Sequence, residues 1–235
     1  MQLFFIENLN SSDTSFTFNK EESRHIVKVL RMKEGQGLLI TDGKGLMMEA
    51  EISNADQNRC EVNIIKKDVD YQKRNYHIHM AVAPTKMNDR FEYFLEKATE
   101  IGFDEITPII CQRSERKVVK SERLQKVVLA AAKQSLKAYL PKVNEAVRFN
   151  DFLKQNHQAE KFIAHCIEED KKSLKTELKA NKNYLVLIGP EGDFSKEEVD
   201  LAIEKGFTPV SLGNFRLRTE TAALVAVHSI AFVNE

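Results

Sequence analysis

Two short segments combine glycines with charged or polar residues directly after apolar runs. The first, Gly189–Gly192, has the sequence GPEG and follows the apolar run Tyr184–Ile188. Glycines on both sides of a proline let a backbone approach a bound molecule closely, and open α/β sheets bind ligands beyond the carboxyl ends of their strands. A plain turn in which glycine only supplies a positive φ explains the spacing equally well. The segment is therefore a candidate ligand loop with a structural alternative.

The second segment, Leu212–Thr221, runs from a leucine-glycine pair through two arginines to Thr-Glu-Thr. Arg218 and Glu220 lie where the next helix is expected to begin, and such a position suits an anion or a polar ligand. Arginines in a solvated turn are the alternative. The following residues, Ala222–Phe232, are apolar on nearly every face, which predicts a buried helix. A subunit interface and a central core position both fit this helix.

Familiar phosphate-binding patterns are missing from the chain. No GxxxxGK[ST] segment occurs, and no GxGxxG segment follows a strand. These absences disfavour a P-loop ATPase, a Rossmann dehydrogenase and a methyltransferase of the common Rossmann type.

Positive charge is concentrated in one stretch of a neutral chain. The 235 residues carry 35 Lys+Arg and 35 Asp+Glu, which excludes a uniformly basic nucleic-acid packager. Cys111–Lys142 nevertheless holds nine basic and two acidic residues, a local charge of +7. A phosphate backbone is the partner that this pattern favours, although any one of these residues alone fits a solvated helix face. The basic residues are Arg113, Arg116, Lys117, Lys120, Arg123, Lys126, Lys133, Lys137 and Lys142, and an N-terminal segment adds Arg24, His25, Lys28 and Arg31.

Composition and the remaining polar residues narrow the class of protein. A chain that is 42% hydrophobic and 30% charged is typical of a globular protein. No apolar run approaches the roughly 20 residues of a membrane span, and the N-terminus lacks a signal-peptide pattern. Three scattered cysteines match neither a disulfide framework nor a zinc site, so we expect a cytoplasmic protein without a metal. His77 and His79 are interpreted as structural, and His165, at a strand end, as a residue that could line the ligand pocket.

The first 70 residues are expected to form a small β-barrel. Gly37–Ile52 reads as a hairpin around Asp42-Gly43, and Cys60–Ile65 reads as a further strand. Glu22–Met32 is predicted to be a short helix that turns Ile26, Val29 and Leu30 inward. The charged segment Lys66–Asn75 lacks periodicity and is interpreted as a linker.

From residue 76 the pattern changes to alternating strands and helices, which predicts an α/β domain with a mostly parallel sheet over residues 76–235. Helices are expected at Asn88–Ile101, at Arg123–Tyr139 and from Ser195, whose spacing to Glu198 is that of a capping box. The predicted strands are Ile78–Ala83, Glu105–Cys111, Phe162–Ile167, Tyr184–Ile188 and Pro209–Leu212.

Five motifs of the chain resemble the RsmE family of 16S rRNA (uracil-N3)-methyltransferases, in the SPOUT superfamily. The motifs are RHIVKVLR, KATEIGFDEITPIICQRSER, AAKQSLKAYLP, LIGPEGDFSKEE and LGNFRLRTETAAL, and they span essentially the whole chain. The resemblance implies a PUA-like barrel followed by an α/β domain with a deep trefoil knot. It also implies S-adenosylmethionine as methyl donor, a homodimer, and a uridine of 16S rRNA in the small ribosomal subunit as substrate. The chain departs from the family pattern at Asp193, often a glycine, and at Lys133, often a glutamate.

The resemblance assigns roles to residues of this chain. The cofactor would be held by Ile188, Gly189, Pro190, Glu191, Gly192, Leu212, Gly213, Leu217, Arg218, Thr219, Thr221 and Ala222. The RNA would be held by Arg24, His25, Lys28, Arg31, Arg113, Ser114, Arg116, Lys133 and Gln134.

Uracil N3 must lose its proton to become a nucleophile, which asks for a base and for stabilisation of the carbonyl oxygens. Glu191 or Glu220 is the candidate base. Arg218, or Arg113 reaching across the dimer, is the candidate stabiliser. Two alternatives stay open: a SPOUT enzyme that modifies tRNA or a ribose 2′-hydroxyl, and a non-catalytic ribosome-assembly factor that binds RNA.

Overall fold

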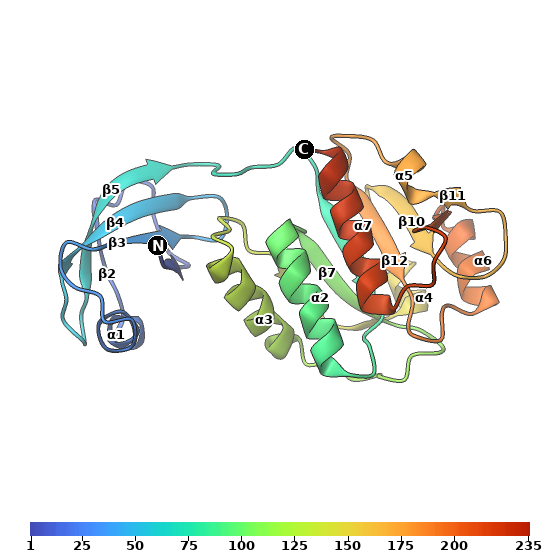
Figure 1. The fold of residues 1–235 in the computed structure, drawn as a ribbon, viewed down its shortest axis with the longest axis horizontal. Helices are drawn as coiled ribbons and strands as arrows, with labels where there is room; N and C mark the ends of the chain where they lie inside the picture. The colour runs from blue at the N-terminus through green and yellow to red at the C-terminus, as the bar shows by residue number, and fades with distance from the viewer. The chain divides into compact units, whose positions relative to one another are not determined.

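The computed structural model describes all residues, Met1–Glu235, and the chain forms two compact units. The first unit contains Met1–Lys73 together with Ala132–Leu140, and the second contains Arg74–Ala131 together with Pro141–Glu235. The segment Ala132–Leu140, which the sequence places inside the second domain, thus packs with the first unit. Figure 1 shows the elements of both units.

The first unit is built on a five-stranded sheet with the order β1-β3-β4-β5-β2. Strand β1 runs parallel to β3, and the other neighbours are antiparallel. Phe4, Phe18, Leu38 and Met48 are among the buried residues of its core. The hydrogen-bonded path ends at β1 and β2, so the predicted closure into a barrel is not made by backbone pairing. The strands are β1 (Leu3–Phe5), β2 (Ser15–Thr17), β3 (Gly37–Thr41), β4 (Met47–Asn54) and β5 (Glu61–Asp68).

The predicted hairpin forms between β3 and β4, but its connection is longer than a two-residue turn. The carboxylate of Asp42 accepts the backbone N–H groups of Lys44 at 2.7 Å and Leu46 at 3.0 Å. Gly43 and Gly45 have φ values of 73° and 110°. A Cβ at Gly45 would lie 2.3 Å from the hydroxyl of Tyr139, so only glycine fits there. The aspartate side chain, rather than strand pairing, organises this connection.

The predicted helix Glu22–Met32 divides into two shorter elements. Helix α1 (Lys20–Arg24) begins at Asn19, whose side chain accepts the N–H of Glu22, and a π-helical turn, η1 (His25–Val29), follows it. Ile26 is buried as predicted, whereas Val29 is 64% exposed. The inward assignment of Val29 assumed α-helical spacing, whereas Val29 is the last residue of the wider π turn, in which side chains point in other directions than in an α-helix.

Only part of Lys66–Asn75, the segment predicted to be a linker, connects the two units. Strand β5 extends through Asp68, because Lys66 and Lys67 still pair with β4. Arg74 already belongs to the second unit, where its guanidinium donates to the carbonyl of Gly102 and to the carboxylate of Asp104.

The second unit contains an eight-stranded sheet in the order β11-β13-β10-β12-β6-β7-β8, with β9 pairing to β7. All of its pairs are parallel, as predicted. The strands are β6 (Ile78–Val82), β7 (Glu105–Ile110), β8 (Lys142–Val143), β9 (Val147–Arg148), β10 (Glu160–Ala164), β11 (Lys172–Ser173), β12 (Tyr184–Ile188) and β13 (Thr208–Ser211). Strand β10 ends before His165, three residues earlier than predicted.

Helices cover both faces of this sheet, so the unit has three layers (Figure 1). One apolar core joins the sheet to α2 (Asn88–Ile101), α7 (Thr219–Val233) and the first part of α3 (Ser121–Gln134). A second core joins the other face to α4 (Phe149–Phe152) and α6 (Lys196–Glu204). The short helix α5 (Leu174–Glu177) contributes Leu174 to the first core. Helix α3 ends at Gln134 instead of Tyr139, and Ser195 and Glu198 form both hydrogen bonds of the predicted capping box.

Helix α7 is a core helix on one side only. Ala223, Ala226, Val227 and Ile230 are fully buried, whereas Phe232 is 66% exposed. Burial on nearly every face was predicted. Within a single chain one face of the helix is buried, and the opposite face is not. None of the helices is long and apolar enough to cross a membrane.

A buried polar cluster lies on β6 and β7. His79 is buried, its Nε2 is 2.8 Å from Oγ1 of Thr107, and its Nδ1 is 3.8 Å from the Glu105 carboxylate. Burial lowers the pKa of His79 from its ordinary 6.5 to about 4, although Glu105 opposes the shift. His79 is thus structural, as expected, and neutral near pH 7.

This burial predicts a loss of stability in mild acid. Between pH 6.5 and 4 the unfolded chain binds a proton at His79 that the folded chain excludes, so folding weakens as the pH falls. From pH 7 to pH 5 the loss is about 2 kcal/mol of unfolding free energy. His79→Gln should flatten this part of the pH dependence in urea unfolding, whereas His228→Gln, at an exposed histidine, should follow the wild type. Equal pH dependences for wild type and His79→Gln would contradict the assignment.

Candidate functional site

Three adjacent parallel strands end at the same edge of the second sheet. Ala164, the last residue of β10, pairs with Ile188 at the end of β12 and with Val210 of β13. The segments that follow, from His165, Gly189 and Leu212, therefore begin at the same edge of the sheet. This edge is where open α/β sheets place their ligands.

The Gly189–Gly192 loop is held by side chains from elsewhere in the unit. Oε1 of Glu191 accepts the backbone N–H of Lys86 at 2.8 Å, while its Oε2 is buried without a partner. A Cβ at Gly189 would lie 3.0 Å from the ring of Phe194. Neither glycine of this loop has a positive φ. The interpretation that glycine only supplies a positive φ is therefore wrong here, and close packing is what requires Gly189.

The second loop, Leu212–Arg218, leads to the start of α7. Gly213 has a φ of 128°, and a Cβ there would meet nothing within 4 Å, so the loop has open space beside it. Oγ1 of Thr219 donates to the carbonyl oxygen of Gly189 at 3.1 Å in a buried hydrogen bond. Glu220 is 8% exposed, and its Oε2 has no partner. The Thr219 bond joins the two predicted cofactor loops directly.

The remaining predicted cofactor residues surround this junction to different extents. Ile188 and Pro190 are buried beside Gly189, and Leu212 and Ala222 pack partly against the first core. Leu217 is half-buried, whereas Gly192 and Thr221 are exposed. Arg218 is the N-cap residue of α7, and its exposed side chain makes no hydrogen bond or ion pair within the chain.

Arg113 is engaged by its own chain. One guanidinium nitrogen donates to the carbonyl oxygens of Gly192 at 3.0 Å and Phe194 at 3.3 Å. The suggestion that Arg113 reaches across a dimer thus competes with two hydrogen bonds that this residue already makes. Its position fits a role in holding the first loop.

Two carboxylates at this edge were not among the predicted site residues. Glu198 accepts the N–H groups of Gln112 at 2.7 Å and Ser195 at 2.9 Å, and so links the QRS segment to α6. Asp193 accepts the N–H of Cys166 at 2.7 Å. The capping-box spacing of Glu198 was a usable signal, whereas the bond from Asp193 depends on a fold that brings residues 166 and 193 together. No group of three His, Cys, Asp or Glu is arranged to hold a metal ion.

Several charges of the basic stretch are neutralised locally. Arg123 pairs with Glu92, Lys133 with Glu22, and Lys142 with Glu105. The residues of the stretch that stay exposed without an ion pair include Lys117, Lys120 and Lys126, and Arg116 is half-exposed. Ion pairing therefore reduces the charge that the stretch can offer to a phosphate backbone.

Two polar residues predicted to contact RNA differ in their access to a partner. Ser114 is 4% exposed, and its hydroxyl accepts the N–H of Cys111. It shapes a turn and is not available at the surface, so its assignment as an RNA contact is not supported. Gln134 is exposed.

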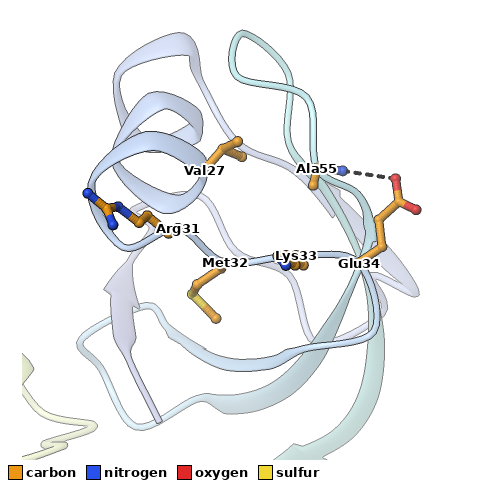
Figure 2. A pocket seen from close by; sticks show the side chains of 6 residues that line it. All are labelled: Val27, Arg31, Met32, Lys33, Glu34 and Ala55. Carbon is orange, nitrogen blue, oxygen red and sulfur yellow. Dashed lines mark hydrogen bonds between the residues drawn. The ribbon is translucent and has the colours of Figure 1, made fainter.

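The first unit carries a hollow of about 460 Å³ next to its basic residues. Figure 2 shows Arg31 and Met32 on one side of this hollow and Ala55 and Glu34 on the other, where Oε1 of Glu34 accepts the N–H of Ala55. Arg31, which lies two residues after the π-helical segment, has a φ of 56°. Arg24, His25, Lys28 and Arg31 are all exposed. These four residues can therefore meet a large polyanion.

The bond between the loops predicts an asymmetry between two nearby threonines. Thr219→Val removes the only hydrogen-bond partner of the buried Gly189 carbonyl, which should lower the unfolding free energy by about 1–3 kcal/mol in urea titrations. Thr221→Val, at an exposed position two residues later, should change it by less than about 0.5 kcal/mol. Equal effects would mean that the Thr219 hydroxyl does not join the loops.

Comparisons with known proteins assign the chain to a family. A profile described as an RNA methyltransferase domain matches residues 72–231, and one described as an RNA methyltransferase PUA domain matches residues 18–65. A probable rRNA-methyltransferase from Porphyromonas gingivalis has a crystal structure with a TM-score of 0.89 and 38% identity, over 100% of this chain and 98% of that one.

Two further relatives carry a more specific name. Ribosomal RNA small subunit methyltransferase E of Rickettsia conorii is 30% identical over 88% of this chain and 85% of its own length. The enzyme of the same name from Neisseria gonorrhoeae was crystallised bound to S-adenosyl methionine, and it matches with a TM-score of 0.86 and 27% identity over 100% of this chain and 98% of that one. With its PUA-like first unit and its parallel α/β second unit, the chain belongs to the ribosomal RNA small subunit methyltransferase E family.

Proposed function

We propose that this chain transfers a methyl group from S-adenosylmethionine to N3 of a uridine in the decoding region of 16S rRNA, within the small ribosomal subunit. The observation that carries the proposal is the direct bond between the two loops at the carboxyl edge of the sheet, from Thr219 to Gly189. This bond brings the GPEG and LRTETA segments into one site.

The residues at this site fit the cofactor. Glu191 and Glu220 each hold a buried carboxylate oxygen without a partner, which suits a ligand that carries positive charge. The open space beside Gly213 gives a ligand access to the loop backbone. When bound, S-adenosylmethionine supplies a methyl group that its sulfonium already activates for transfer. The residues proposed to hold it are Ile188, Gly189, Pro190, Glu191, Gly192, Leu212, Gly213, Leu217, Arg218, Thr219, Thr221 and Ala222.

The chain's own task is then to orient the uracil and to move its N3 proton. Glu220 is the better candidate base, because the backbone of Lys86 already occupies one oxygen of Glu191. Arg218 is the better candidate for stabilising charge on the uracil carbonyl oxygens. Its side chain is free, whereas that of Arg113 is bonded to the first loop.

The RNA is proposed to dock through the first unit and the exposed lysines of the basic stretch. Methylation at N3 requires a uridine whose Watson–Crick edge is accessible, so the target is expected to be unpaired or splayed from its stack. The exposed side chains of Arg24, His25, Lys28, Arg31 and Gln134 support binding of the surrounding RNA backbone, as does the half-exposed Arg116. Lys133 is half-buried and paired with Glu22, so binding through it requires that this ion pair opens.

The proposal includes a trefoil knot formed by the two cofactor loops, a homodimer and a cytoplasmic location. The exposed Phe232 on α7 supports a subunit contact along that helix. Methylation of a base and methylation of a ribose hydroxyl require the same cofactor site. The assignment of uridine N3 as the acceptor is therefore based on family membership, and methylation of tRNA or of a ribose hydroxyl is the competing function.

Replacement of one free arginine tests the reaction. Arg218→Ala should reduce methyl transfer to small subunits by at least about 100-fold, as expected when a group that stabilises developing charge is lost. The unfolding temperature should change little, because the Arg218 side chain is exposed and makes no hydrogen bond or ion pair within the chain. Arg216→Ala, an exposed arginine two residues earlier, is the matched control and should keep most of the activity.

The readout is mass spectrometry of nucleosides from subunits isolated without the modification and then treated with enzyme and cofactor. Methyl on uridine N3 supports the proposed acceptor. Full activity of Arg218→Ala sinks the role of Arg218, and methyl found on ribose or on tRNA alone overturns the proposed acceptor.

A further inference from the structure

His165 stands out among the histidines of the chain. It is 6% exposed, and neither its Nδ1 nor its Nε2 meets a hydrogen-bond partner. His79, the other buried histidine, bonds to Thr107, and the half-buried His157 lies near the carbonyl oxygen of Phe152. A buried ring with two unpaired nitrogens is unusual, because a buried polar group without a hydrogen-bond partner destabilises the fold.

The ring is neutral near pH 7. Burial lowers the pKa of His165, the nearby ammonium of Lys171 lowers it further, and the carboxylate of Asp193 acts in the opposite direction. A neutral imidazole has one N–H donor and one nitrogen that accepts a hydrogen bond. Both nitrogens of His165 can therefore be satisfied by a partner that donates one hydrogen bond and accepts another.

Its position places it between the two cofactor loops. Strand β10 lies between β12 and β13 and ends at Ala164, which is in register with Ile188 and Val210. The next residue along each strand is His165 on β10, Gly189 on β12 and Ser211 on β13. His165 thus begins a third segment at the edge where the other two loops begin.

The backbone around His165 is fixed. The N–H of Cys166 donates to Asp193 at 2.7 Å, and Nζ of Lys171 donates to the carbonyl oxygens of His165 and Ile167, both at 2.8 Å. These bonds hold the backbone of the segment beside Asp193, the residue that directly follows the first cofactor loop. The attachment point of the His165 ring is therefore preorganised next to that loop.

We propose that His165 is a contact of the cofactor pocket and that its neutral ring hydrogen-bonds to the adenosine part of S-adenosylmethionine. Ribose hydroxyls and the adenine edge present donors and acceptors together, which match one N–H and one bare nitrogen. The ammonium of the cofactor's amino-acid end is better matched by a carboxylate such as Glu191. The inference rests on the proposed function and adds a third segment to the two loops that the sequence motifs identify.

Calorimetry with two cofactor fragments tests the contact. S-adenosylhomocysteine contains the whole cofactor except its methyl group, and 5′-methylthioadenosine lacks the amino-acid end. His165→Phe should weaken both ligands by about tenfold or more, since two hydrogen bonds are lost. His228→Phe, at an exposed histidine on α7, should bind both as the wild type does.

The outcomes separate the two proposals. If the wild type binds neither ligand, the proposed function fails. If the wild type binds these ligands and the dissociation constants of His165→Phe lie within twofold of the wild-type values, the ring does not contact the ligand and the inference is overturned.

If the variant does not fold, the contact can be tested in the wild-type protein by nitrogen NMR of the His165 ring. The ring signals are assigned by through-bond correlation to the His165 backbone. Saturating 5′-methylthioadenosine should shift both ring signals of His165. Unchanged signals would overturn the contact.

Discussion

The candidate site depends on the common direction of three neighbouring strands. Because β10, β12 and β13 are parallel and adjacent, segments that begin at residues 165, 189 and 212 meet at one edge of the sheet. The hydrogen bond from Thr219 to Gly189 then closes the contact between two of them. The bond fixes the start of α7, where Arg218 is the N-cap residue, and the proposed cofactor site and the proposed role of Arg218 both depend on this arrangement. A change that separates these strands should therefore disable the site without touching a proposed catalytic residue.

Much of the second unit was predictable because local patterns and tertiary structure agree there. The bounds of α2 and β12 match their predictions, since helical spacing with a glycine stop and a continuous apolar run are unambiguous signals. The early end of α3 was not predictable from periodicity, because residues after Gln134 pack with the first unit. The π-helical turn at His25–Val29 was missed for a similar reason: nothing in the spacing of Ile26 and Val29 distinguishes it from an α-helix.

For the site, the sequence identified the loops but not their internal bonds. The glycine-rich segments and the family motifs identified Gly189–Gly192 and Leu212–Thr221, which follow β12 and β13, the two strands on either side of β10. The carboxylates that hold these loops, Glu191 and Asp193, act on backbone groups of Lys86 and Cys166, which are distant in sequence. Such contacts exist only once the strand order is known. The same limit applies to charge, because ion pairs neutralise Arg123, Lys133 and Lys142, which simple counting assigns to an RNA-binding surface.

A crystal structure of the chain with S-adenosylhomocysteine would show whether one cofactor site forms where these segments meet. We expect the ligand between Gly189–Gly192 and Leu212–Thr221, with the Thr219 bond intact and the adenosine within hydrogen-bond distance of His165. A ligand bound elsewhere, or loops that separate and lose the Thr219 bond when the ligand binds, would contradict it.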